Sequence, residues 1–174
     1  LGLLGDVEAY HVYVVLTSSV CLLFVHLFTQ KAFGHSAALF AGLALSLYPF
    51  YFAESHFDIK NIVQANFFTV SLLSFYFWVR NKFSVHWFAL FIVASFLALG
   101  TKWNIAFLPF ISLPWFFVVM LKKEVRVAAT WPKVILYGLL ALIVPFVLLI
   151  IFWPFLWTDT IPRLVSTFRF YAGL

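Results

Sequence analysis

Residues 53–61 (Ala-Glu-Ser-His-Phe-Asp-Ile-Lys-Asn) bring four ionisable side chains together in a chain that is otherwise almost entirely apolar. Glu54 and Asp58 could act as a general acid or base, and His56 could move a proton. Lys60 could hold a phosphate as a point charge. Ionisable groups beside hydrocarbon cost a few kcal/mol each. The cluster therefore predicts a catalytic or ligand-binding site, and the alternative is a solvated turn.

The spacing inside this cluster limits what it could bind. Glu54 and Asp58 are one helical turn apart, and Asn61 shares their face if the following helix begins early. Neighbouring carboxylates repel each other unless a lysine, a histidine, a metal ion or a substrate offsets their charge. The spacing of Glu54, His56 and Asp58 matches no metal fingerprint, so no metal site is predicted and a divalent cation stays an open alternative.

The composition indicates an integral membrane protein. Hydrophobic residues make up 65% of the chain, charged residues 10%, and the mean hydropathy is +1.06. Soluble domains carry about a quarter charged residues. The net charge of +5 does not indicate nucleic-acid binding, because the cations lie between apolar runs, as membrane topology requires. The single Cys21 excludes a disulfide within the chain.

Six apolar runs approach the length of about 20 residues that crosses a bilayer core. We expect a single all-α domain over residues 1–174, a polytopic bundle whose short connections make consecutive helices antiparallel. Pro109, Pro114 and Pro145 fall inside these runs and predict kinks. The predicted spans are residues 11–29, 35–52, 61–78, 83–100, 103–121 and 134–153.

Charge is distributed unevenly between the two ends of these spans. One end holds seven Lys or Arg residues and one acid, whereas the other holds four cations and five acids. The positive-inside rule makes the first end cytoplasmic. The N-terminus, the 53–61 cluster and the C-terminal tail then share the extracytoplasmic face, where we expect them to converge. The cations of the basic end are Lys31, Arg80, Lys82, Lys122, Lys123, Arg126 and Lys133.

The C-terminal tail predicts a short amphipathic helix. Residues 158–160 (Thr-Asp-Thr) can cap a helix, and Pro162 suits its first turn. Apolar residues recur at helical spacing over 161–171, with Arg163 on another face. The segment is too short and too charged to span, so we expect it in the membrane interface. The alternative is a helix that packs on the bundle.

Three stretches resemble the polyprenyl-phosphate-sugar-dependent glycosyltransferases of the GT-C fold, the family of the protein mannosyltransferases and aminoarabinose transferases. Residues 54–63 (Glu-Ser-His-Phe-Asp-Ile-Lys-Asn-Ile-Val) are similar to the family's His-Ser-His-Phe-Asn-Pro-Lys-Asp-Ile-Pro, without its prolines and with Asn and Asp interchanged. Residues 98–104 (Ala-Leu-Gly-Thr-Lys-Trp-Asn) resemble its Gly/Ala-Thr-Lys turn. Residues 152–159 (Phe-Trp-Pro-Phe-Leu-Trp-Thr-Asp) resemble its Trp-Pro-Trp-Leu-Trp-x-Asp segment, and the likeness runs from about 10 to 170.

The resemblance implies a membrane enzyme that takes a sugar from a polyprenyl-phosphate donor at the extracytoplasmic face of a bacterial-type plasma membrane. In the family, a carboxylate in the first extracytoplasmic loop acts as base on the acceptor. We expect this chain to be an internal fragment that lacks this loop. Asp6, Glu8 and Asp58 are then only weak candidates for the base. No cofactor is predicted, with a divalent cation as the open alternative, and the sequence identifies neither the sugar nor the acceptor.

The donor half of that chemistry agrees with the residues themselves. Fixed cations stabilise the negative charge that builds on a leaving polyprenyl phosphate. Lys60 and Lys102 lie at the predicted extracytoplasmic end, and Arg163 or Arg169 of the tail could close over the same phosphate. The predicted substrate-binding residues are Glu54, His56, Asp58, Lys60, Asn61, Lys102 and Arg163.

Two other classes of protein stay open. A transporter or lipid-handling permease would use the polar cluster as part of a path, and such proteins usually place charge in the middle of their spans. Here the charges gather at span ends, which favours an active site at the membrane surface. A noncatalytic membrane scaffold is the third interpretation.

Overall fold

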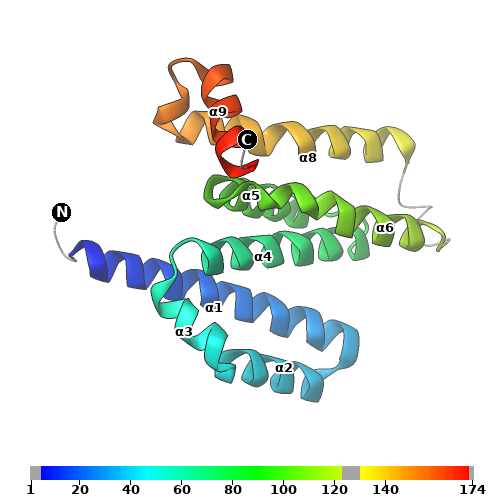
Figure 1. Ribbon diagram of the computed structural model, residues 1–174. Coiled ribbons are helices and arrows are strands. Elements are labelled where there is room, and N and C mark those ends of the chain that lie inside the picture. The colour runs from blue at the N-terminus through cyan, green and yellow to red at the C-terminus, as the bar shows by residue number, and fades with distance from the viewer. Residues whose placement is uncertain (1–4, 123–129, 173–174) are drawn as a thin grey trace. The chain divides into compact units, whose positions relative to one another are not determined.

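The computed structural model describes residues 5–122 and 130–172, and every regular element in these two ranges is a helix. The all-α class is therefore confirmed. The helices are α1 (Asp6–Phe33), α2 (His35–Leu47), α3 (Pro49–Phe57), α4 (Asn61–Arg80), α5 (Val85–Thr101), η1 (Trp103–Phe107), α6 (Leu108–Met120), α8 (Trp131–Phe152), η2 (Pro154–Leu156) and α9 (Thr160–Ala172) (Figure 1).

Four helical segments are long and apolar enough to cross a bilayer, so the chain is a multi-pass membrane protein. They are Val7–Phe33, Asn61–Arg80, Trp103–Met120 and Trp131–Phe152. A fifth span results if α2 and α3, bent by 62° at their junction, are counted as one. Helix α5, with 17 residues, is shorter than these spans. The number of six spans is therefore not confirmed.

The predicted second span, 35–52, is wrong as a single helix. Tyr48 has an extended backbone (φ −62°, ψ 115°) and separates α2 from α3. The ring of Pro49 disfavours the helical conformation in the residue before it. Proline is tolerated at the first position of a helix because that position has no intrahelical N–H bond to lose. The chain therefore stops one helix at Tyr48 and begins another at Pro49.

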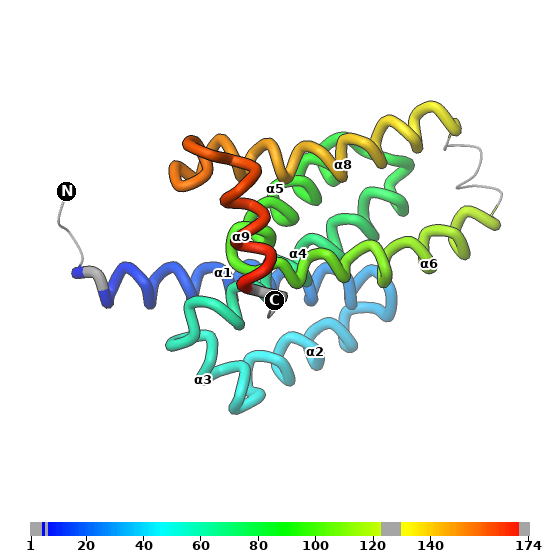
Figure 2. Tube along the Cα trace, turned by 45° about the horizontal axis from the view of Figure 1, so that its top comes forward, coloured from blue at the N-terminus to red at the C-terminus, as the bar shows by residue number. Residues whose placement is uncertain are grey.

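The chain divides into two compact units, Leu1–Leu73 and Ser74–Leu174, and the boundary falls within α4. In the first unit α1 packs against α2 and α3, and Figure 2 shows the chain turning back between α1 and α2. Gly34 is the residue between these two helices. Gly34 has φ 94°, which residues with a side chain rarely adopt. Val14, Ile62 and Val63 form a buried cluster that joins α1 to α4.

In the second unit α5 packs against α8, and rings from α4, α5, α6 and α8 contact one another. Phe75 of α4 lies 5.5 Å from Phe91 and 6.1 Å from Phe116, measured between ring centroids. Trp78 of α4 lies 5.3 Å from Tyr137 of α8. Many of the 24 Phe residues therefore serve contacts between helices, with offset and edge-to-face geometry.

Candidate functional site

Asp58 forms the joint between α3 and α4. Its backbone N–H donates to the Glu54 carbonyl at 2.9 Å and ends α3. Its Oδ1 accepts hydrogen bonds from the backbone N–H groups of Lys60 and Asn61, both at 2.8 Å, and its Oδ2 accepts one from Asn61 Nδ2 at 2.7 Å. Such bonds satisfy N–H groups that the first turn of α4 leaves without a helical partner. Asp58 and Asn61 are thus engaged in capping a helix, which weakens their candidacy as base and substrate ligand.

Glu54 and Asp58 are neighbours, as their spacing predicted, and both lie outside the four spans named above. Desolvation, a hydrogen bond to Asp58 and its negative charge raise the pKa of Glu54. The pKa of Asp58 is lowered, because hydrogen bonds from Asn61, Lys60 and Glu54 outweigh a raising effect of desolvation. Environments that separate the pKa values of two carboxyls assign them different roles. Glu54 is the group that takes a proton first, and Asp58 stays ionised.

His56 is oriented by its own helix. Its Nδ1 lies 2.7 Å from the Phe52 carbonyl oxygen and donates to it, because a carbonyl only accepts. The ring also packs on Phe52 at 4.7 Å. Nε2 is then the nitrogen that remains for a ligand, as an acceptor in the neutral ring or a donor in the charged one.

The start of α1 lies at the same end of the first unit as this cluster. His11 of α1 meets Phe57 of α3 edge to face, with 5.8 Å between ring centroids. Glu8 is one helical turn before His11 and is exposed. Two of the three segments that were predicted to converge therefore do so. His11 was missed in the sequence, where a lone histidine at the end of an apolar run carried no signal.

Glu8 has a structural role at the start of α1. It occupies the first turn of the helix, where negative charge interacts favourably with the helix dipole. The side chain of Asp6, the other acid proposed there, lies outside the described part of the chain. Glu8 also folds back over Gly5, since a Cβ atom placed on Gly5 would lie 2.4 Å from Glu8 Oε2. A glutamate at this position commonly reaches back toward the residue that caps the helix.

A buried polar network holds α3 in place. The Tyr51 hydroxyl lies 3.1 Å from Asn66 Oδ1 and 3.2 Å from the Ser18 carbonyl oxygen, and Asn66 Nδ2 donates to Ser18 Oγ at 2.9 Å. Asn66 is 1% exposed. The network ties α3 to α1 and α4, and so determines where the residues that follow Tyr51, including Glu54 and His56, are presented. Sequence reasoning missed it because Ser, Tyr and Asn are not rare in spans.

Lys60 is exposed at the joint, beside the carboxylate of Asp58 that its backbone N–H binds. In the described part of the chain, no group of three His, Cys, Asp or Glu side chains is placed to hold a metal ion. The groups available for chemistry at this end of the first unit are therefore the carboxyls of Glu54 and Asp58, the imidazoles of His11 and His56, and the lysine Lys60.

In the second unit, the second and third stretches of the resemblance pack together. Leu99 of α5, Leu149 of α8 and Leu156 of η2 form a buried cluster, covered by Trp103 and by Leu164 of α9. Lys102 lies beside this cluster, half-buried, with an extended backbone between α5 and η1. Residues far apart in the sequence thus form one end of this unit.

The predicted C-terminal helix is confirmed as α9. It packs on the bundle through Leu164 and through Phe168, whose ring lies 5.7 Å from that of Trp103. The apolar side chains of Ile161, Val165 and Phe170 are exposed, as expected of an interfacial helix. Arg163 bonds the Phe155 carbonyl and stacks 4.7 Å from the Phe155 ring, so its guanidinium anchors α9 to η2.

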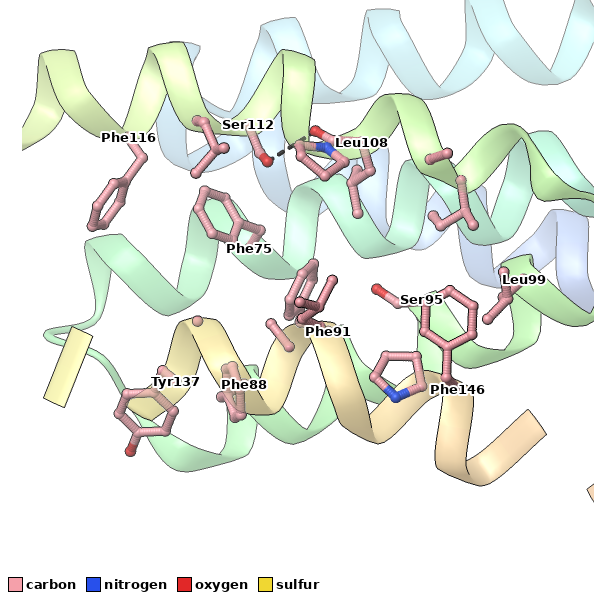
Figure 3. A pocket seen from close by; sticks show the side chains of 18 of the residues that line it. Phe75, Phe88, Phe91, Ser95, Leu99, Leu108, Ser112, Phe116, Tyr137 and Phe146 are labelled. Atoms are coloured by element: carbon pink, nitrogen blue, oxygen red, sulfur yellow. Dashed lines mark hydrogen bonds between the residues drawn. The ribbon is translucent and has the colours of Figure 1, made fainter. Parts of the chain in front are cut away.

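An apolar cavity of about 620 Å³ lies within the second unit (Figure 3). Trp78, Phe88 and Tyr137 form one end, and Trp103, Phe146 and Phe168 the other. Gly138 and Ala141 line it on α8. Two small residues at helical spacing among large apolar ones were the only sequence signal for this cavity, and sequence reasoning passed over them.

The predicted substrate-binding residues fall in both units. Glu54, His56, Asp58, Lys60 and Asn61 gather in the first, and Lys102 and Arg163 lie at one end of the second. A single site formed by all seven stays a prediction. No protein-family model, no curated protein and no solved structure matches this chain significantly.

Proposed function

We propose that this chain is part of a membrane glycosyltransferase that takes a sugar from a polyprenyl-phosphate donor. The observation that carries the proposal is the polar end of the first unit. There Glu54 and Asp58 share a hydrogen bond with opposite pKa shifts, beside His56, His11 and Lys60. Sugar transfer needs acid–base groups for the acceptor and fixed cations for the leaving phosphate, and these residue types can supply both.

Within this proposal the roles differ from those first expected. Lys60 interacts with the donor phosphate, since its side chain is exposed while its backbone is held by Asp58. His56 presents Nε2 to the donor or acceptor. Asp58 and Asn61 shape the joint rather than contact the substrate. Lys102 is a second candidate for the phosphate, because it lies at the end of α5 beside an aromatic wall.

The test is sugar transfer from a polyprenyl-phosphate donor by membranes that contain the protein, together with photo-crosslinking of a donor analogue. Lys60→Ala is expected to lower transfer by about 10²-fold or more, the effect of losing one donor to developing charge. Lys31→Ala, a lysine in the last turn of α1, is the matched control and is expected to be neutral. Unchanged crosslinking and transfer in Lys60→Ala would remove Lys60 from the site.

A lipid-handling permease is the second candidate, and the apolar cavity of the second unit favours it. The two functions differ in their product. A transferase releases polyprenyl phosphate and glycosylated acceptor, whereas a permease moves intact lipid between leaflets. Lipid movement in proteoliposomes without sugar release would support the permease and contradict the transferase.

A further inference from the structure

The two ends of the apolar cavity differ in polarity. At the Trp78 end, the indole N–H of Trp78 is buried and has no hydrogen-bond acceptor within the described part of the chain, although Trp78 itself is only 4% exposed. A buried donor without a partner costs about 1–3 kcal/mol. A ligand that brings an oxygen acceptor to this end would remove that cost.

Three cations lie close in the sequence to residues of the same end. Lys133 lies one turn before Tyr137 on α8, with Nζ 5.9 Å from the Tyr137 ring centroid. Arg80 follows Trp78 by two residues, and Lys82 precedes Phe83, whose ring meets that of Trp78 at 5.0 Å. Arg80 and Lys82 are therefore within four residues of Trp78, and Lys133 is within four residues of Tyr137, the ring that Trp78 contacts. Among the described residues of this unit, the one carboxylate is that of Asp159, which lies beside η2 and α9.

The backbone of the turn between α4 and α5 is strained at two residues. Lys82 and Phe83 both have left-handed φ values, 54° and 61°. A bulky residue there costs about 1 kcal/mol or more. Phe83 is 2% exposed against Trp78 and donates its N–H to the Trp78 carbonyl at 2.9 Å. The turn thus buries Phe83 and leaves Lys82 exposed.

The length and lining of the cavity suit a single hydrocarbon chain. Its wall on α8 extends from Val134 to Phe146, about 18 Å at 1.5 Å per residue. One leaflet of a bilayer core is about 15 Å deep. Gly138 leaves open space in this wall, since a Cβ atom added there would meet nothing within 4 Å.

We infer that this cavity binds one acyl chain of an anionic phospholipid from the leaflet on the basic side of the membrane. Lys133, Lys82 and Arg80 hold its phosphate, and the Trp78 N–H bonds an ester oxygen. At the other end of the cavity Lys102 precedes Trp103, and Arg163 is engaged by Phe155, so it is the unpartnered indole N–H that distinguishes the Trp78 end. The inference does not rest on the proposed sugar transfer and concerns a lipid other than the donor.

Native mass spectrometry of the full chain, exchanged into neutral detergent with equal amounts of phosphatidylglycerol and phosphatidylcholine, tests the inference. Wild type is expected to retain phosphatidylglycerol preferentially. Lys133→Gln is expected to weaken that retention about fivefold, and Arg80→Gln/Lys82→Gln/Lys133→Gln to remove the preference, since each basic residue near an anionic lipid contributes a similar factor. Lys31→Gln, a basic residue of the first unit, is the matched control.

A second variant tests the cavity itself. Gly138→Leu fills the open space with a better helix former and is expected to abolish retention of phosphatidylglycerol while the protein stays folded. Leu139→Phe, on the exposed side of α8, is the control and should retain it. Three outcomes would overturn the inference: equal retention of the two lipids by wild type, unchanged retention in Gly138→Leu, or displacement of the lipid by water-soluble glycerol phosphate.

Discussion

The helices of the two units are held together by different kinds of contact. In residues 1–73, helix positions are specified by hydrogen bonds, with Tyr51, Ser18 and Asn66 joining three helices and Asp58 joining two. In residues 74–174, contacts between helices are mostly made by rings and leucines, and these leave a cavity. Lipid tails are as apolar as leucine, so helices in a membrane need polar bonds or close packing to hold one arrangement.

The difference also separates the chemistry that each unit can perform. One end of the first unit carries ionisable groups, with Lys60 exposed and Glu54, His56 and Asp58 half-buried, at a joint fixed by capping bonds, which suits acid–base work. The second unit lines an apolar cavity with Lys133 near one of its ends, which suits lipid binding. Substitutions that weaken each kind of contact separately test this difference between the two units.

The largest effect is expected from the apolar packing of the second unit. Leu156 is fully buried between Leu99 and Leu149, and Leu156→Ala leaves a void there. We expect a loss of about 3 kcal/mol in the free energy of unfolding, measured by thermal melting in nanodiscs. Leu139→Ala, at an exposed position of α8, should change it by about 0.5 kcal/mol or less. Equal effects would show that apolar packing does not hold this unit together.

A smaller effect is expected from the polar network of the first unit. Asn66→Ala removes the partner of both Tyr51 and Ser18 and should cost about 1–2 kcal/mol, the upper range for hydrogen bonds between membrane helices. Amide hydrogen exchange should rise in α3 in particular, because the network holds that helix. Ser46→Ala, whose hydroxyl bonds only its own helix, is the control. Unchanged exchange in α3 would contradict the role given to Tyr51.

The smallest effect, about 1 kcal/mol at neutral pH, is expected from the cap of α4. Asp58→Ala removes the acceptor of three hydrogen bonds. Because the folded state lowers the pKa of Asp58 below its ordinary 3.8, the stabilisation is present above that pH and is lost as the pH falls below it. Wild type and Asp58→Ala should therefore converge in melting temperature at low pH.

The partner of Asp58 provides the matched control for this prediction. The raised pKa of Glu54 has the opposite sign: its contribution is full at low pH and falls as the pH rises through that pKa. Glu54→Gln should therefore leave the protein equally or more stable at neutral pH. A loss of stability in Glu54→Gln would contradict the repulsion between the two carboxyls.

The class of the protein and most helix positions were predictable, because hydropathy and helical spacing are local properties of the chain. The exception is residues 35–52, where Pro49 divides the run into two helices bent by 62°. The sequence analysis ran one span through this proline. The angle between the two helices is a property of the tertiary structure, in which Tyr51 of α3 bonds Ser18 of α1 and Asn66 of α4. Neither bonding partner is within 14 residues of Tyr51.

Of the candidate site, the sequence alone determined where the ionisable residues cluster, because charge beside hydrocarbon is rare and costly. The role of each residue depends on the contacts that it makes in the tertiary structure. The tertiary structure placed Asp58 and Asn61 in a helix cap, Arg163 against Phe155, and His11 beside Phe57. It also created the cavity. Gly138 and Ala141 are a local sign of open space on α8, but the wall combines residues from 75 to 168. Such a void depends on how side chains of separate helices fail to fill the space between them, and this is a property of packing rather than of residue type.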